Sequence, residues 1–182
     1  PRYECNNKGV FWIGVKTSRD GEAMEQEPIR LADAIELIGN GIDANSDYYR
    51  IIHFRDRLSR QNKTVALPMG EIGSNACWQR LQALGLFIAS GKTKREKLAD
   101  YLQEHGSKTP YHVTNKAGWC KDVYILPSGE VMQNDTSKNT QRIIYNGDKS
   151  QATAYTPAGT LEEWQTEIAQ YAAGNSRLCL AL

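Results

Sequence analysis

The order of the apolar patterns along the chain constrains its fold more than any single motif does. Apolar and polar residues alternate, with the period of a strand, in the first 70 residues and again after residue 120. Between these regions, apolar residues recur at the three- and four-residue spacings of helices. Strands thus precede and follow helices without regular strand–helix–strand alternation. The pattern predicts an α+β fold, with a mainly antiparallel or mixed sheet and about three packed helices.

The alternating segments and their turn residues predict the strands. We expect a hairpin from residues 48–54 and 64–67, connected by residues 58–63. The polar segment 17–26 is predicted to be a loop. Further strands are expected at residues 2–5, 10–16, 123–126, 130–133 and 142–145.

Four segments have helical spacing. The first is 29–38, where Leu31, Ala34, Ile35 and Ile38 would form one face. The second starts near Ser74, and its apolar stripe runs from Cys77 to Ile88 across Gly85. The third carries the stripe 98–105 and stops at Gly106. The fourth starts at a capping box formed by Thr160 and Glu163 and ends at residues 174–175.

The 182 residues can bury one sizeable core, and we expect a single domain over residues 1–174. Residues 175–182 are predicted to begin a helix that leads toward a further domain. No apolar run approaches the roughly 18 residues that a membrane span needs. The four cysteines are far apart in the sequence, which favours free thiols in a reducing cytoplasm over a zinc site.

The charge is unevenly distributed, although the whole chain carries only +1. Residues 1–47 have a net charge of −4, residues 48–97 have +7 and residues 98–182 have −2. A basic segment of this kind attracts a polyanion such as nucleic acid. The competing interpretation is a hairpin and a helix with ordinary solvated cations.

Catalytic motifs are weak. Gly85 and Gly91-Lys92-Thr93 resemble a phosphate-binding P-loop, but five residues separate the glycines where that loop has four. His112 and Cys120 could pair as base and nucleophile, but nothing around them marks an activated thiol. We therefore predict no catalytic residue, metal ligand or cofactor in this chain. A primase or nuclease stays open as an alternative, if separate carboxylates such as Asp122, Glu130 and Asp135 converge on Mg²⁺.

Aromatic and basic residues alternate within the basic segment, which is typical of proteins that bind single-stranded nucleic acid by stacking and phosphate contacts. Tyr48, Tyr49 and His53 are the candidates for base stacking. The candidates for phosphate contacts are Arg50, Arg55, Arg57, Arg60, Lys63, Lys92, Lys94, Arg95 and Lys97. Alternation should send Arg50, Ile52 and Phe54 to one face of the strand, and Tyr49, Ile51, His53 and Arg55 to the other.

Three stretches, taken together, resemble the family of domains of unknown function numbered 927. They are KAGWC at 116–120 with VYILPSGE at 123–130, GTLEEW at 159–164, and AGNSRLCLAL at 173–182. Further support comes from YRIIHFR at 49–55 leading to VALPM at 65–69, and from LGLFI at 84–88 followed by LADYL at 98–102.

The resemblance implies a context. In that family the segment similar to 173–182 is followed by a P-loop ATPase domain, in helicases or primase-helicases of phages, plasmids and other mobile elements. The chain would then be the N-terminal part of a replicative helicase, and ATP and Mg²⁺ would belong to a motor domain outside it.

Two functions follow as expectations. The first is non-catalytic binding of single-stranded or forked DNA, largely independent of sequence. The alternative is an oligomerisation or protein-interaction collar, in which the acidic first 47 residues of one subunit meet the basic segment of the next.

Overall fold

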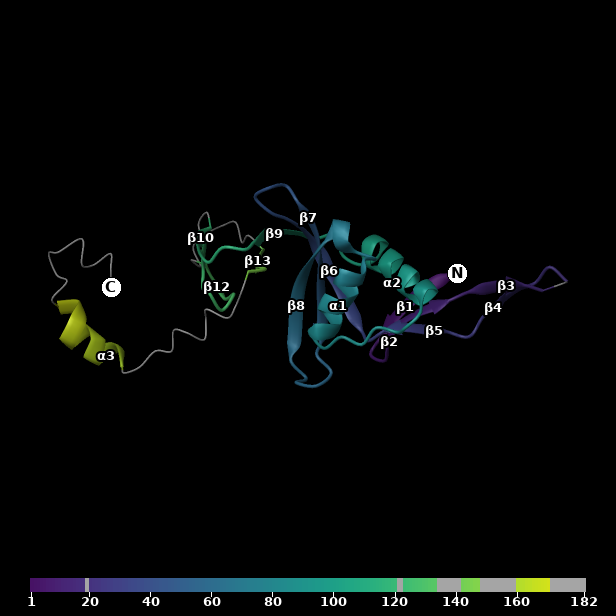
Figure 1. Cartoon of the computed structure of the whole chain (residues 1–182), viewed down its shortest axis with the longest axis horizontal. Coiled ribbons are helices and arrows are strands. Elements are labelled where there is room, and N and C mark those ends of the chain that lie inside the picture. Colours follow the sequence, from purple (N-terminus) through teal and green to yellow (C-terminus); the bar gives the residue numbers. More distant parts are fainter. Residues whose placement is uncertain (19, 121–122, 134–141, 148–159, 171–182) are drawn as a thin grey trace. The chain divides into compact units, whose positions relative to one another are not determined.

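The computed structural model describes residues 1–18, 20–120, 123–133, 142–147 and 160–170 (Figure 1). The chain divides into two compact units, Pro1–Gly147 and Asp148–Leu182. The boundary that we predicted at residue 174 lies outside the described residues, as does the predicted helix at 175–182, and both stay predictions.

A five-stranded mixed sheet forms the centre of the first unit, in the order β13-β9-β6-β7-β8. Strands β6, β7 and β8 are antiparallel, whereas β6, β9 and β13 run parallel to one another. The strands are β6 (Ile35–Ile42), β7 (Tyr48–Arg55), β8 (Asn62–Pro68), β9 (Pro110–Thr114) and β13 (Ile143–Tyr145). The predicted hairpin and the predicted α+β class are therefore confirmed.

Two helices cover one face of this sheet (Figure 1). They are α1 (Asn75–Ala83) and α2 (Lys92–Glu104), and the 3₁₀ turn η1 (Met69–Glu71) leads into α1. Ser74 caps α1, because its hydroxyl accepts a hydrogen bond from the Cys77 N–H at 3.2 Å. The core between sheet and helices buries Ile35, Ile52 and Leu67 from the sheet with helix residues that include Trp78 and Leu98.

The predicted alternation along β7 is confirmed. Ile52 and Phe54 belong to the core under the helices, whereas Tyr49 and Ile51 belong to a second buried cluster, with Ala66 and Val113. Strand β7 is thus buried on both faces over most of its length, as expected for the middle of a sheet.

A second, antiparallel sheet contains β1 (Arg2–Asn6), β2 (Gly9–Ile13) and β5 (Ile29–Ala32), in that order. The predicted loop at 17–26 is partly wrong, because β3 (Val15–Thr17) pairs with β4 (Ala23–Glu25) as a short hairpin. The predicted strands at 2–5 and 10–16 are present, and the second is interrupted at Gly14.

The predicted helix at 29–38 is wrong, because this segment forms β5 and the start of β6. Leu31, Ala32 and Ile35 are fully buried, and Ile38 lies at an irregularity in the β6–β7 pairing. Two short strands separated by a break at residues 33–34 place Leu31, Ala32 and Ile35 in the core, and this spacing of buried residues also fits a helix.

The predicted stripe from Cys77 to Ile88 is also longer than the helix. Helix α1 ends at Ala83, and Gly85 follows with a φ of +93°, a backbone conformation that glycine adopts without strain. Ile88 then forms an isolated antiparallel bridge with Ala32, so the end of this segment belongs to the sheet region.

A small antiparallel sheet follows β9, formed by β10 (Gly118–Cys120), β11 (Val123–Ile125) and β12 (Val131–Gln133). In the second unit, α3 (Leu161–Trp164) continues into the π-helical segment η3 (Gln165–Ala169). Its predicted capping box is confirmed: the Glu163 N–H donates to the Thr160 hydroxyl at 3.2 Å, and the Thr160 N–H donates to the Glu163 carboxylate at 2.8 Å. Within the described ranges, no helix is long and apolar enough to cross a membrane.

Candidate functional site

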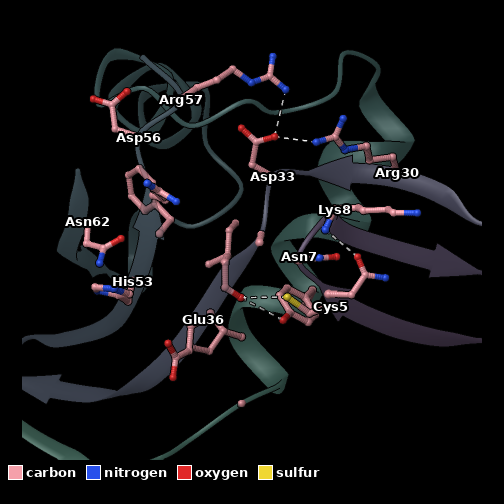
Figure 2. A pocket seen from close by; sticks show the side chains of 18 of the residues that line it. Cys5, Asn7, Lys8, Arg30, Asp33, Glu36, His53, Asp56, Arg57 and Asn62 are labelled. Atoms are coloured by element: carbon pink, nitrogen blue, oxygen red, sulfur yellow. Dashed lines mark hydrogen bonds and ion pairs between the residues drawn. The ribbon is translucent and has the colours of Figure 1, made fainter. Parts of the chain in front are cut away.

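A crevice of about 970 Å³ opens in the first unit and is lined mainly by three segments that are far apart in the sequence, together with Tyr101 of α2 and Gly106 just after that helix (Figure 2). The first segment is the turn between β1 and β2, and the second is the connection from β5 into β6. The third is the end of β7 with the turn into β8. We call it the cationic crevice, after its five cationic lining residues Lys8, Arg30, Arg55, Arg57 and Arg60.

The acidic residues of the cationic crevice do not neutralise all of these cations. Asp33, Glu36 and Asp56 also line it. Asp33 already pairs with two of the arginines, and Asp56 pairs with Lys63. Among the residues that the structure describes, no carboxylate pairs with Lys8, Arg55 or Arg60. The crevice therefore presents unneutralised positive charge, which suits an anionic ligand.

Asp33 organises one wall of the crevice. One of its oxygens accepts hydrogen bonds from Arg30 at 2.7 Å and from Arg57 at 3.1 Å (Figure 2). Its other oxygen accepts the Phe87 N–H at 3.1 Å, and the Asp33 N–H donates to the Phe87 carbonyl, also at 3.1 Å. The two guanidinium carbons lie 5.2 and 4.8 Å from the centre of the Phe87 ring. Two arginines are thereby held in fixed positions beside an aromatic ring.

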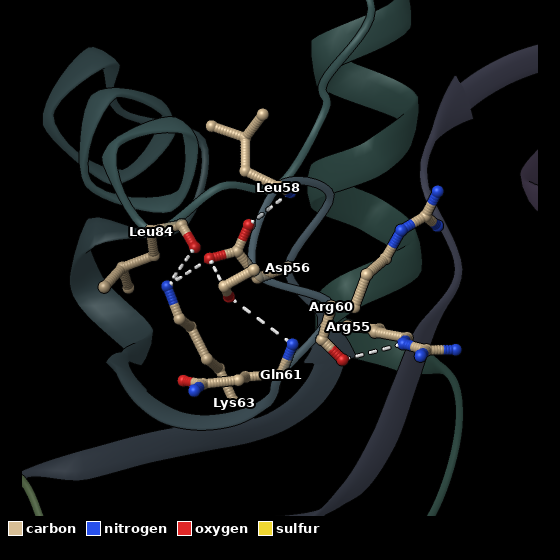
Figure 3. A network of polar contacts seen from close by, with 8 residues as sticks. Arg55, Asp56, Leu58, Arg60, Gln61, Lys63 and Leu84 are labelled. Atoms are coloured by element: carbon tan, nitrogen blue, oxygen red, sulfur yellow. Dashed lines mark hydrogen bonds and ion pairs between the residues drawn. The ribbon is translucent and has the colours of Figure 1, made fainter.

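Asp56 orders the turn between β7 and β8 (Figure 3). Its carboxylate accepts hydrogen bonds from the Lys63 ammonium at 2.7 Å, the Leu58 N–H at 2.8 Å and the Ser59 hydroxyl at 2.9 Å. These donors, Lys63 first, hold the pKa of Asp56 well below its usual range. A side chain at Gly85 would collide with this carboxylate, which is a second reason for glycine there.

Lys63 therefore has a structural role at this turn, and its predicted contact with phosphate stays a prediction. Its ammonium also donates to the Leu84 carbonyl at 2.9 Å, so it joins the turn to the end of α1. Arg55 and Arg60 differ from Lys63, because within the described residues their guanidinium groups make only one hydrogen bond, from the Arg55 Nε to the Arg60 carbonyl at 2.8 Å. Both side chains are exposed, and Figure 3 shows their guanidinium groups directed away from the Asp56 network.

The prediction that Arg50 contacts phosphate is wrong, because the side chain is only 1% exposed. Its guanidinium donates to the carbonyls of His105, Ser107 and Gly39 and to the Asn40 side chain. The His105 and Ser107 carbonyls immediately follow α2, where the helix dipole favours a cation. Burial lowers the pKa of Arg50, and no carboxylate in the described residues pairs with it.

The three predicted stacking residues lie in different environments. Tyr48 is 65% exposed. Tyr49 is buried, its hydroxyl donates to Asp43 at 3.1 Å, and burial followed by this hydrogen bond raises its pKa, so its predicted stacking role is wrong. His53 lines the cationic crevice, and its Nδ1 lies 2.9 Å from the Thr64 hydroxyl.

The predicted cations of α2 form a separate group, and none of them lines the cationic crevice. Lys92 lies 3.9 Å from Glu96, and Lys94 is exposed. The Arg95 Nε is buried and has no hydrogen-bond partner among the described residues, and the Lys97 ammonium lies 3.5 Å from the centre of the Trp12 ring. Gly91 is the N-cap of α2 and provides no side-chain hydrogen bond, so these cations are gathered at the positive end of the helix dipole.

The same segment does not have the architecture of a P-loop. Such a loop connects a strand to a helix, whereas α1 and an irregular segment with one isolated bridge precede Gly91. In the described part of the chain, no group of three or more His, Cys, Asp and Glu side chains could hold a metal ion. The described cysteines Cys5, Cys77 and Cys120 are free thiols.

A comparison with protein-family models matches residues 3–182 to the family described as "Domain of unknown function (DUF927)". The chain belongs to this family. No curated protein matches it. The membership confirms the resemblance carried by the motifs from YRIIHFR to AGNSRLCLAL, and the family's description assigns no activity to any residue.

Four residues at the cationic crevice or beside it were missed by the sequence analysis: Lys8, Arg30, Asp33 and Phe87. The first three precede the basic segment, in a part of the chain whose net charge is negative. Only the pairing of β2 with β5 and of β6 with β7 brings them next to Arg55 and Arg57. No local pattern indicates this neighbourhood, although a basic residue beside the turn glycine Gly9 and an Arg-x-x-Asp spacing at residues 30–33 were available as weak signals.

Proposed function

We propose that the first unit is a non-catalytic module that binds single-stranded nucleic acid through the cationic crevice. The observation that carries the proposal is the set of three cations, Lys8, Arg55 and Arg60, that face one crevice without a carboxylate partner in the described residues. Phosphate groups are the ligands that exposed arginines and lysines bind with least regard to sequence. Recognition by this module is therefore largely independent of sequence.

The cations of α2 provide a second contact for a strand that extends beyond the crevice. Lys92 and Lys94 are exposed at the first turn of α2, where the unpaired backbone N–H groups also favour an anion. Each cation weakens the helix slightly, because a positive side chain is unfavourable beside the positive, N-terminal end of the helix dipole. A contact with phosphates would offset that cost.

The context of the proposal comes from the family resemblance. The module would belong to a replicative helicase of a mobile element or phage, act in the cytoplasm, and hold single-stranded or forked DNA near a motor that uses ATP and Mg²⁺. No catalytic step is assigned to the chain itself.

The test is fluorescence anisotropy of a labelled single-stranded oligonucleotide across a salt series. The double variant Arg55→Gln, Arg60→Gln removes two crevice cations, and its matched control, Lys108→Gln, Lys116→Gln, removes two exposed cations elsewhere. For the crevice variant we expect affinity to fall about tenfold or more at low salt. We also expect the slope of log K against log salt to decrease in magnitude by about 1.4, because each phosphate contact on a single strand contributes about 0.7.

The control variant should bind like the wild type. Equal losses of affinity in the two variants would mean that binding depends only on the total positive charge of the chain. The crevice would then not be the binding site. If the wild type does not bind at low salt, the nucleic-acid proposal is wrong, and light scattering of the chain then tests the oligomerisation collar directly.

A further inference from the structure

Phe87 is an aromatic residue held at the surface by the wall of the cationic crevice. It lies between α1 and α2, and 37% of its surface is exposed. The Phe87 N–H donates a hydrogen bond to the Asp33 carboxylate, and the Phe87 carbonyl accepts one from the Asp33 N–H. The backbone hydrogen bonds and the two neighbouring guanidinium groups fix the ring in place, and its exposed part is available to a ligand.

The two arginines beside Phe87 leave part of the ring free. The Arg30 and Arg57 guanidinium groups both contact the ring region, and both also bind the same Asp33 oxygen. The exposed 37% of Phe87 is the part of the residue that these two groups leave open to solvent. The result is a surface of one phenyl ring and two planar guanidinium groups, at the edge of a crevice with excess positive charge.

We infer that an unpaired base of a single strand stacks on Phe87 and on the adjoining guanidinium planes, while the neighbouring phosphates lie against the crevice cations. Aromatic rings and guanidinium planes are the groups on which proteins stack unpaired bases, whatever the base. Asp33 is then a positioning residue, because it holds both arginines and the Phe87 backbone without touching the strand. The inference rests on the proposed function and narrows its ligand to a strand with accessible bases.

Duplex DNA cannot use this surface, because its bases are already stacked on one another. It would gain only the phosphate contacts of the crevice. The preference for a single strand over a duplex therefore measures the stacking, and the salt dependence measures the phosphate contacts.

The first test replaces Phe87 by leucine, which keeps an apolar side chain and removes the ring. The matched control is Trp119→Leu, because Trp119 is also exposed but does not line the crevice and, within the described residues, has no cation over its ring. We expect Phe87→Leu to weaken single-strand binding at least about fivefold, with an unchanged salt slope and unchanged duplex binding. Trp119→Leu should leave all three unchanged.

A direct readout uses the wild-type protein and needs no variant. An oligonucleotide that contains the fluorescent base 2-aminopurine loses emission when that base stacks on an aromatic ring. We expect binding of the wild type to quench a 2-aminopurine placed in the strand, and Phe87→Leu to abolish that quenching at saturating protein. Quenching that persists in Phe87→Leu would overturn the inference.

The variant Asp33→Asn distinguishes a role of Asp33 in positioning the two arginines from an effect of its negative charge alone. This variant raises the net charge of the crevice by one, so electrostatics alone predicts tighter binding of single strands and duplexes. Because asparagine holds the two guanidinium groups less strongly than a carboxylate does, we expect weaker single-strand binding with no loss of duplex binding. Tighter binding of both would contradict the positioning role.

The outcomes distinguish this inference from the proposed function. If the wild type binds single strands but Phe87→Leu binds them equally well, the stacking inference fails and the crevice proposal stands. If the wild type binds neither single strands nor duplexes at low salt, both fail together.

Discussion

Arg50 and Arg55 lie on the same strand, β7, yet the two ends of that strand use arginine in opposite ways. Arg50 is 1% exposed, and its two terminal guanidinium nitrogens donate to carbonyl groups that follow α2. Arg55 is exposed, and in the part of the chain that the structure describes its guanidinium makes one hydrogen bond, from the Nε to the Arg60 carbonyl. The sequence YRIIHFR contains both and gives no sign of this difference.

The comparison shows that a count of positive charges overstates the surface available to a polyanion. Near one end of β7, carbonyl groups that follow α2 accept hydrogen bonds from the arginine, which is buried. At the other end, the strand leaves the sheet in a turn ordered by Asp56, and the arginines remain in solvent. What covers the strand decides the role of each charge, and that is a property of the tertiary fold.

The largest expected effect is on stability, and it comes from replacing the buried arginine of β7, Arg50. Arg50→Met should lower the free energy of unfolding by about 3 kcal/mol, because it leaves several buried carbonyl groups without donors. Urea denaturation at pH 7 measures it. Arg55→Met should change the same quantity by no more than about 0.5 kcal/mol. Similar losses in both variants would remove the distinction between the two ends of β7.

At its exposed end, β7 continues into a turn that the Asp56 carboxylate orders. The pH dependence of the protein's stability tests this role of the carboxylate. The pKa of Asp56 is lowered in the folded state, so its charged form stabilises the fold above the unfolded pKa of about 3.9 and loses this contribution as the pH falls further. Asp56→Asn should therefore reduce the urea midpoint at pH 7, and its difference from the wild type should shrink below about pH 4. A difference independent of pH would show that the hydrogen bonds at this turn do not require the charge.

The smallest effect concerns the cations of α2, which lie outside the crevice. Lys94→Glu should raise the free energy of unfolding by about 0.5 kcal/mol, because it replaces a cation near the positive end of the helix dipole with an anion. The same variant should weaken nucleic-acid binding if α2 provides the second contact. Thermal unfolding and anisotropy on one preparation measure both, and a variant that is less stable would show that Lys94 has a structural partner.

The sequence predicted the elements whose residues alternate or recur clearly, and failed where tertiary contacts decide between two patterns. The hairpin of β7 and β8, helix α2 and the capping box at Thr160 were predicted because each has its own local signal. Residues 29–38 were predicted as a helix because Leu31, Ala34, Ile35 and Ile38 fit that spacing. In the fold, β5 pairs with β2 and β6 pairs with β7 and β9, and the break between β5 and β6 brings Leu31, Ala32 and Ile35 into the core at a spacing that a helix shares.

For the site, the sequence identified Arg55, Arg57, Arg60 and His53, which line the cationic crevice. It also selected Arg50, Tyr49 and Lys63, whose buried or paired positions no local pattern reveals. Lys8, Arg30 and Asp33 come to the crevice through strand pairing between distant segments. A site built at the meeting of three segments is visible only when their pairing is known.

The strand order β8-β7-β6-β9-β13 has a consequence for how the chain is made. During synthesis, β6, β7 and β8 emerge first and can pair at once as a meander, but β6 then keeps an open edge until β9 is made, more than 40 residues later. When β9 adds, its own edge stays open until β13 emerges, about 30 residues further on. The growing sheet thus exposes one unpaired edge after another at the ribosome, and each is a template for pairing with a neighbouring nascent chain. Slow translation between β8 and β13 would lengthen that exposure, and we expect the yield of folded protein to depend on it.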